Sequence, residues 1–255
     1  MKILSPISLI LFLPFLSFCQ NQVEIDEDNR VKYDQEILDY MAKHPHNDQP
    51  SISLGTPGNG SLKNGKLLPF YGENHTYFDK KSYLAGRAFL NSYVLNLALS
   101  AYDSLFVKYP NRKFGIMECA NQHGGKLYPH RTHQNGLSID FMMPLLKDGQ
   151  PYYGADSLGV QHYLMEFNDD GKLLKDQSIE IDFNLVAEHI LILAEKADEA
   201  NMKIEKVIIK IELKDELFAT EYGKKLKASG IYVVKGLTPL VNSLHDDHFH
   251  IDFKL

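Results

Sequence analysis

The sequence contains only two cysteines, Cys19 and Cys119. Cys19 directly follows an apolar segment, residues 3–18, that has the pattern of an export signal. We therefore expect residues 1–20 to be a signal peptide that the mature protein no longer carries. Because a single remaining cysteine cannot form an intramolecular disulfide, we expect the fold to depend on its apolar core alone, even in an oxidising compartment.

Two other fates of the N-terminal segment stay open. Its length is close to the ~18 residues that a membrane span needs, but Pro6 and Pro14 interrupt it and no cationic stop follows. We therefore favour cleavage over a signal anchor and expect no transmembrane span in the mature chain. Leu16 lies three positions before Cys19, as in bacterial lipid-attachment sequences, although Phe18 replaces the small residue of such sequences. Cys19 is thus a candidate lipid anchor, and the expected location is periplasmic or secreted.

The chain also lacks an excess of basic charge. Its 27 lysines and arginines stand against 33 aspartates and glutamates, which gives a formal net charge of -6 at pH 7. Proteins that bind nucleic acid or anionic lipid generally carry clusters of lysine and arginine. We therefore expect no nucleic-acid partner. The apolar fraction of 44% is instead typical of a globular protein that buries a large core.

Residue spacing predicts both helices and strands. Apolar residues at helical spacing, with capping and stop residues, predict helices over residues 33–43, 82–109, 185–199 and 214–229. Short apolar or β-branched runs predict strands over residues 114–117, 207–211, 231–234 and 248–253. Segments rich in glycine, asparagine and proline predict a loop at 55–65, an irregular loop at 121–129 and hairpins within 148–178.

These segments do not alternate as they do in a nucleotide-binding βαβ fold. We therefore predict an α+β fold in which a mixed or antiparallel central sheet is flanked by helices. No internal repeat or low-complexity tract divides the chain. The expected organisation is a signal peptide at residues 1–20, a polar lead-in at residues 21–50 and a single domain at residues 51–255.

Histidines are concentrated in two short segments. Five of the eleven histidines lie within residues 130–140 and 245–250, and both segments also contain aspartate. A catalytic zinc ion takes three protein ligands from imidazole and carboxylate groups and keeps a fourth position open. The two segments together offer such a set, so we predict a metal site to which both contribute.

The spacing within the second segment has a geometric meaning. Side chains two residues apart on a strand point to the same face, so His248 and His250 should face one site. Phe249 between them should point into the core and hold the strand rigid. Asp246 and Asp247 are expected to orient a neighbouring imidazole through its second nitrogen, as is usual around metal-bound histidines.

The first segment is not expected to present its side chains along one helix. Asn135 and Gly136 lie between His133 and Asp140 and favour a turn. We therefore expect His133 and Asp140 to be brought together across a turn and a strand. Three other histidines are expected to have structural roles: His123, His162 and His189.

The order and spacing of these residues resemble those of the penicillin-insensitive murein endopeptidases. The residues that carry the resemblance are His130, His133, Gly136 and Asp140, followed far downstream by residues 245–250. Upstream of His130, three further groups of residues also occur in the order that this family shows: residues 61–65, Leu68-Pro69, and Gly124-Gly125 before Pro129. The resemblance covers residues 55–145 and 236–254, whereas residues 146–235 match only loosely.

That family is part of a wider group of zinc metallopeptidases named for lysostaphin, the D-Ala-D-Ala metallopeptidases and sonic hedgehog. The resemblance implies that residues 51–255 form one zinc metallopeptidase domain that cuts peptide cross-links between peptidoglycan stem peptides. It implies zinc ligation by His133, Asp140 and His250, with His248 as the general base. His130 and His245 would be auxiliary, because either could hydrogen-bond to the oxyanion, and His130 could instead bind a second metal.

Two other functions fit the same residues. The chain could be a D,D-carboxypeptidase or dipeptidase of the same group, or a zinc-binding module that does not hydrolyse. His248 argues against the module, which needs no base beside its metal. It also argues against the carboxypeptidases and dipeptidases, which tend to place Glu or Asp two positions before the last ligand. We therefore expect an endopeptidase.

Overall fold

The computed structural model describes residues 34–255, so the expected signal peptide and Cys19 lie outside the described residues. None of the helices within residues 34–255 has the length and hydrophobicity that a membrane span requires. Helix α1 (Gln35–Lys43) lies where the first helix is predicted. Asp34 caps it by accepting a hydrogen bond from the backbone N–H of Glu36.

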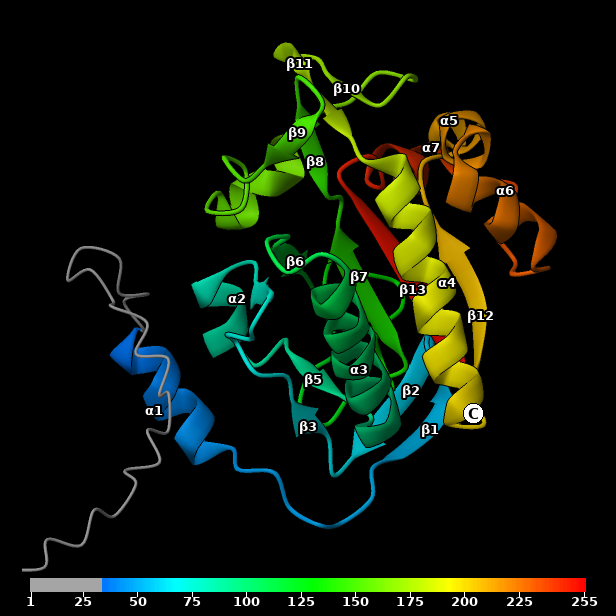
Figure 1. Cartoon of the computed structure of the whole chain (residues 1–255). Coiled ribbons are helices and arrows are strands. Elements are labelled where there is room, and N and C mark those ends of the chain that lie inside the picture. Colours follow the sequence, from blue (N-terminus) through cyan, green and yellow to red (C-terminus); the bar gives the residue numbers. More distant parts are fainter. Residues whose placement is uncertain (1–33) are drawn as a thin grey trace, which may run out of the picture. The chain divides into compact units, whose positions relative to one another are not determined.

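A five-stranded sheet forms the centre of the structure (Figure 1). Its strands lie in the order β12 (Lys203–Ile208), β13 (His248–Lys254), β7 (Ser138–Met142), β6 (Phe114–Ile116) and β4 (His75–Tyr77). β4 and β6 are parallel, and the other neighbouring pairs are antiparallel. The sheet is therefore mixed, and the predicted α+β class is confirmed.

Helices α3 (Ser92–Lys108) and α4 (Phe183–Glu199) pack side by side against one face of this sheet (Figure 1). Phe141 of β7 and Phe249 of β13 stack with ring centroids 5.2 Å apart, and His189 of α4 contacts both rings. All three side chains are buried, so this face of the sheet forms the core. The alternate residues of β7 and β13 then face the opposite side.

A second, four-stranded antiparallel sheet contains the predicted hairpins. Its strands lie in the order β10 (Lys172–Leu173), β11 (Asp176–Ile181), β8 (Leu145–Lys147) and β9 (Gln150–Tyr152). Asp148 and Gly149 form the turn between β8 and β9, and both have positive φ. Between β9 and β10 the chain forms the 3-10 helix η1 (Gly159–Leu164). Residues 145–181 are here named the hairpin region.

The single helix predicted over residues 82–109 is wrong, because this segment contains two helices and a short strand. α2 (Lys80–Leu84) ends before Gly86, whose φ of 81° is readily adopted only by glycine. β5 (Phe89–Leu90) follows and pairs with β3 (Lys66–Leu67). Asn91 then begins α3 by accepting a hydrogen bond from the backbone N–H of Tyr93. A turn and a cap therefore divide a segment whose apolar spacing continues through both.

The loop predicted over residues 55–65 is also wrong, because the chain forms a hairpin there. β1 (Ile52–Thr56) pairs antiparallel with β2 (Asn59–Lys63), and Pro57 and Gly58 form the turn between them. The turn-forming residues that predict a loop therefore serve one tight turn between two short strands.

Three further predictions differ from the structure in the C-terminal part of the chain. The helix predicted over residues 214–229 is divided into α5 (Lys214–Ala219) and α6 (Glu221–Ala228), because Thr220 caps α6 through the N–H of Gly223. The strand predicted over residues 231–234 is reduced to one parallel bridge between Val207 and Val233, and α7 (Pro239–Ser243) follows it. The strand predicted over residues 207–211 shares only residues 207–208 with β12, and Ile211 instead begins the 3-10 helix η2 (Ile211–Leu213). The other predicted helices and strands correspond to α1, α4, β6 and β13.

His189 on α4 is a buried histidine whose ionisation should affect stability. It is 3% exposed and packs against the rings of Tyr102, Phe141 and Phe249. Burial lowers the pKa of His189 from 6.5 to about 3. Between these two pH values the unfolded chain binds a proton that the folded protein does not bind. The free energy of unfolding therefore falls as the pH drops below about 6.5.

We expect the substitution His189→Leu to weaken this acid sensitivity. Each pH unit below the unfolded pKa costs about 1.4 kcal/mol, so the loss of stability between about pH 6.5 and about pH 4.5 should be about 2–3 kcal/mol smaller in the variant. Urea unfolding of the metal-free proteins at both pH values measures this difference. An equal pH dependence in parent and variant would contradict the prediction.

Candidate metal centre

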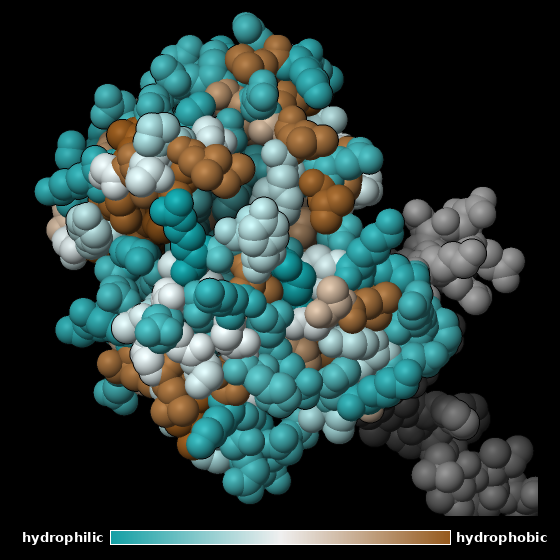
Figure 2. Space-filling view, turned by 180° about the vertical axis from the view of Figure 1, so that it is seen from behind, coloured by the Kyte–Doolittle hydropathy of each residue, from teal (hydrophilic) through white to brown (hydrophobic). Residues whose placement is uncertain are grey.

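Strands β7 and β13 bring predicted site residues together on the face of the sheet opposite α3 and α4. In the antiparallel register, Asp140 lies opposite His250, and Ser138 lies opposite Asp252. Asp140 and His250 are 1% and 2% exposed. His248 shares this face because it stands two residues before His250, as predicted, and the phenylalanine between them lies in the core. Figure 2 shows the molecule from this side, where hydrophobic patches are separated by hydrophilic surface.

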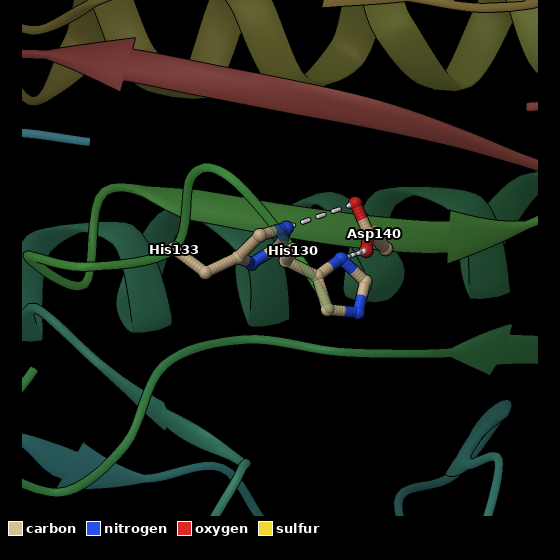
Figure 3. Close-up of side chains that lie close together, drawn as sticks. All are labelled: His130, His133 and Asp140. Carbon is tan, nitrogen blue, oxygen red and sulfur yellow. Dashed lines mark ion pairs between the residues drawn. The ribbon is translucent and has the colours of Figure 1, made fainter. Parts of the chain in front are cut away.

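His133 reaches Asp140 from the loop that precedes β7. Its backbone has a φ of 67°, a left-handed conformation that is uncommon outside glycine. Its Nε2 atom lies 3.2 Å from Oδ1 of Asp140 (Figure 3). His130 lies in the same loop, and its Nδ1 atom is 3.5 Å from Oδ2 of Asp140 (Figure 3). His133 and Asp140 therefore meet across a turn and a strand, as predicted.

His250 approaches the same carboxylate from β13. Its Nδ1 atom lies 2.7 Å from Oδ1 of Asp140, and its ring centroid is 4.8 Å from that of His133. Its Nε2 atom lies 2.8 Å from Oδ1 of Asp252, which also accepts a hydrogen bond from the hydroxyl of Ser138. Two imidazole nitrogens, one from a loop and one from a strand, therefore converge on one oxygen of Asp140.

Two overlapping sets of three groups surround Asp140. His130, His133 and Asp140 offer ligand atoms that all lie within 4.8 Å of one another. His133, Asp140 and His250 form the second set, around Oδ1 of the aspartate. The side chain of His130 is 18% exposed, whereas that of His250 is 2% exposed and is bonded to Asp252. The structure thus brings all four groups to one place.

Several buried polar atoms at this place have no hydrogen-bond partner among the described residues. They include both ring nitrogens of His133, Oδ2 of Asp140 and Oδ2 of Asp247. An unpartnered buried polar atom costs about 1–3 kcal/mol, so its presence calls for an explanation such as a bound ion. Imidazole nitrogen and carboxylate oxygen are the ligand atoms that Zn²⁺ takes in catalytic sites. The residues therefore fit a metal ion such as zinc.

The carboxylates of Asp140 and Asp252 each carry a negative charge that can attract a cation. Burial by itself would raise the pKa of Asp140, but the imidazoles of His133 and His250 outweigh burial and hold this pKa well below 3.8. Burial would lower the pKa of His250, but Asp252 and Asp140 outweigh it and raise this pKa to about 10. The pKa of Asp252 is also lowered, because His250 outweighs the effect of burial. Both carboxylates are thus ionised at neutral pH.

His248 is oriented by the residue before it. Its Nδ1 atom donates a 2.6 Å hydrogen bond to Oδ1 of Asp247, so Nε2 is the nitrogen that can take up a proton. Burial would lower the pKa of His248, but the carboxylate of Asp247 outweighs it and raises this pKa above 6.5. Asp246, the other aspartate expected to orient an imidazole, instead accepts a 3.2 Å hydrogen bond from the backbone N–H of Phe167.

His245 lies beside His248, with ring centroids 4.8 Å apart. Its Nδ1 atom donates a 2.6 Å hydrogen bond to the carbonyl oxygen of Val241, which leaves Nε2 as an acceptor when the ring is neutral. Burial, with the neighbouring His248 and His250, lowers the pKa of His245 to about 3. A neutral His245 with this bond has no N–H to offer to an oxyanion.

The sequence prediction omits two residues that the structure places at the site. Asp252 stands two positions after His250, so the strand alternation that pairs His248 with His250 extends to it and could have identified it. Tyr163 belongs to η1, and its ring centroid lies 5.7 Å from that of His248. It falls in the segment where the motif resemblance is loose, and no local pattern marks it.

Comparison with known proteins extends the resemblance over most of the chain. A family model for penicillin-insensitive murein endopeptidases matches residues 53–255, which include both histidine segments and the hairpin region. No curated protein matches the sequence. The family match also covers residues 146–235, where the motifs agree only loosely. The chain belongs to the penicillin-insensitive murein endopeptidase family.

Proposed function

We propose that the protein is a zinc-dependent endopeptidase that hydrolyses peptide cross-links of bacterial peptidoglycan. Membership of the family supports both the reaction and the polymer. The observation that carries the metal assignment is the convergence of His133 Nε2 and His250 Nδ1 on Oδ1 of Asp140, at 3.2 Å and 2.7 Å. We assign these three residues as the zinc ligands.

The choice of His250 over His130 as the third ligand rests on its surroundings. Metal-bound histidines usually donate their second ring N–H to a carboxylate, which fixes the nitrogen that faces the metal. Asp252 supplies this carboxylate to Nε2 of His250, and Nδ1 then faces Asp140. His130 is left as an auxiliary residue beside the ligands.

Bound zinc would polarise the amide carbonyl and lower the pKa of a coordinated water to about 7. The chain then has to remove a proton from the attacking water. His248 offers Nε2 for this task, because Nδ1 is committed to Asp247. The carboxylate of Asp247 stabilises the imidazolium that forms, and His248 can return the proton to the leaving amine. His248 therefore acts as general base and then as general acid.

The same assignment predicts where the enzyme works. Peptidoglycan lies outside the cytoplasmic membrane, so the enzyme should be periplasmic or secreted. The signal peptide at residues 1–20 and the lipid anchor at Cys19 fall outside the described residues and stay predictions.

The alternative of a zinc-binding module without hydrolytic activity is opposed by the His248–Asp247 pair, which positions a base that such a module does not need.

Digestion of purified murein tests the proposed function. The purified enzyme should convert cross-linked muropeptide dimers into two monomers whose masses sum to that of the dimer plus one water. Treatment with a chelator should stop this conversion, and added zinc should restore it. Mass spectrometry of the products measures both effects.

Two outcomes would favour the other functions. Removal of a single terminal alanine from free stem peptides, with cross-links intact, would indicate a carboxypeptidase. Stoichiometric zinc without any change in the muropeptides would indicate a binding module.

A further inference from the structure

The hairpin region is fastened to the chain just before β13. The Nε2 atom of His162 donates a 3.1 Å hydrogen bond to the carbonyl oxygen of Asp247. Five residues further on, the N–H of Phe167 bonds to the carboxylate of Asp246 at 3.2 Å, and Lys210 bonds to the carbonyl oxygen of Phe167 at 3.1 Å. These contacts hold both sides of the segment that contains Tyr163.

The ring of Tyr163 packs between His248 and Phe78. It meets the ring of His248 edge to face, with centroids 5.7 Å apart and planes at 88°. On another side it meets the ring of Phe78 at 5.6 Å and 80°. Aromatic pairs in this geometry are favourable, so the two contacts hold the phenol beside the proposed base.

The hydroxyl of Tyr163 is a buried group without a hydrogen-bond partner among the described residues. Burial raises the pKa of this phenol well above 10, and the carboxylates of Asp140, Glu118 and Asp247 raise it further. The hydroxyl therefore keeps its proton at neutral pH. Within residues 34–255, Oδ2 of Asp140 and Oδ2 of Asp247 also have no hydrogen-bond partner, although His130 Nδ1 lies 3.5 Å from the former. Both carboxylates act on the phenol electrostatically without a hydrogen bond to it. The hydroxyl of Tyr163 is therefore free to donate its hydrogen bond to a bound substrate.

Three neighbouring polar side chains already use their N–H groups in hydrogen bonds within the protein. His248 uses Nδ1 to bond Asp247, and Nε2 is the atom that must accept a proton. His245 uses its ring N–H for the carbonyl oxygen of Val241. Arg87 bonds Glu118 at 2.7 Å and a backbone carbonyl at 2.9 Å. None of these three side chains presents an uncommitted neutral donor, whereas Tyr163 does. His130 instead places its Nδ1 atom 3.5 Å from Oδ2 of the proposed ligand Asp140.

We propose that Tyr163 is a catalytic residue whose hydroxyl donates a hydrogen bond to the carbonyl oxygen of the scissile amide as negative charge develops on that oxygen. The inference rests on the proposed function and adds to it the donor that stabilises the tetrahedral intermediate. Tyr163 keeps its proton throughout, so the bond that breaks and the proton transfers remain those assigned to the attacking water, the leaving amine and His248. A preorganised donor of this kind acts most strongly in a buried site.

The substitution Tyr163→Phe tests this role, because it removes only the oxygen and keeps the ring contacts. We expect kcat for cross-link hydrolysis to fall about 10²–10³-fold, as for other oxyanion donors, with KM changed by less than about 3-fold. Zinc affinity, measured by chelator competition, should stay unchanged. The melting temperature of the metal-free protein should stay the same or rise, because an unpartnered buried hydroxyl is lost.

Tyr102 offers a matched control. Its hydroxyl is also buried without a partner among the described residues, but it lies on α3, in the core behind the sheet, where its ring stacks on His75. Tyr102→Phe should therefore leave kcat, KM and zinc affinity unchanged. A loss of activity in both variants would show a general effect of removing buried hydroxyls and would overturn the inference.

Other results would also overturn the inference. If the Tyr163→Phe enzyme keeps the parental kcat, the reaction does not need this hydrogen-bond donor. A loss of zinc affinity would make the phenol oxygen a metal ligand, and a rise in KM at constant kcat would make it a ground-state binding group. In each of these cases the parent enzyme still cuts cross-links, so the proposed function stands. A parent enzyme without activity on cross-linked murein would overturn the proposed function and this inference together.

Discussion

Alanine at His133, Asp140 or His250 should remove zinc binding and murein hydrolysis together. Zinc sites with four protein ligands bind the ion with about 10–16 kcal/mol, or about 3–4 kcal/mol per ligand, so losing one ligand should weaken binding roughly 10²–10³-fold. His133 and His250 both converge on Oδ1 of Asp140, so an alanine substitution at any of the three residues removes one proposed ligand of the same site. Metal analysis after gel filtration and competition with a chromogenic chelator measure the loss.

Two further variants make this experiment decisive. His130→Ala should keep one zinc, because His130 is assigned as an auxiliary residue, and His123→Ala controls for the removal of an exposed histidine. If His130→Ala loses zinc while His250→Ala keeps it, the ligand set is instead the cluster of His130, His133 and Asp140. Unchanged zinc in all three ligand variants would refute the site. A parent enzyme that carries two zinc ions would place a second metal at His130.

Alanine at His248 should keep the zinc and lose the hydrolysis. General bases contribute about 10²–10⁴-fold to enzymatic rates, so kcat should fall by about that factor. His248 contacts Asp247 through Nδ1 and is not among the proposed ligands, so zinc affinity should change little. Single-turnover hydrolysis of a purified muropeptide dimer, with zinc content measured on the same sample, separates the two effects.

Two results would contradict the role of His248 as general base. A His248→Ala enzyme that cleaves the dimer at the parental rate would exclude this imidazole as the base. A variant that loses its zinc as well would make His248 a ligand. His123→Ala is again the matched control, because its side chain is exposed.

Part of the site can be predicted from the sequence because strand geometry is local. Side chains alternate between the two faces of any strand, so a histidine pair with one aromatic residue between them indicates a polar face and a core face. His248, Phe249 and His250 obey this rule, with Phe249 stacked on Phe141 in the core. The chemistry of the residue types then indicates a metal, because clustered imidazole and carboxylate groups are typical zinc ligands.

Helix ends are less well predicted, although their signals are also local. The apolar spacing over residues 82–109 continues through Gly86 and Asn91, so it hides the turn and the cap that divide the segment. The hairpin at residues 52–63 shows the opposite error, because its turn-forming residues outnumber the strand-like ones. In both cases pairing with another strand decided the outcome: β5 with β3, and β1 with β2. Such pairing depends on contacts that local spacing does not contain.

The amino-acid sequence by itself determined the residue types of the site, the shared face of His248 and His250, and the α+β class. Only the tertiary structure decided that Asp140 contacts His250 across 110 positions of the chain, through the register of β7 and β13. It also decided that Asp247 and not Asp246 orients His248, and that Tyr163 of η1 contacts the ring of His248. The physical reason is that side-chain direction follows from local backbone geometry, whereas hydrogen-bond partners and burial depend on segments that meet only when the whole chain has packed.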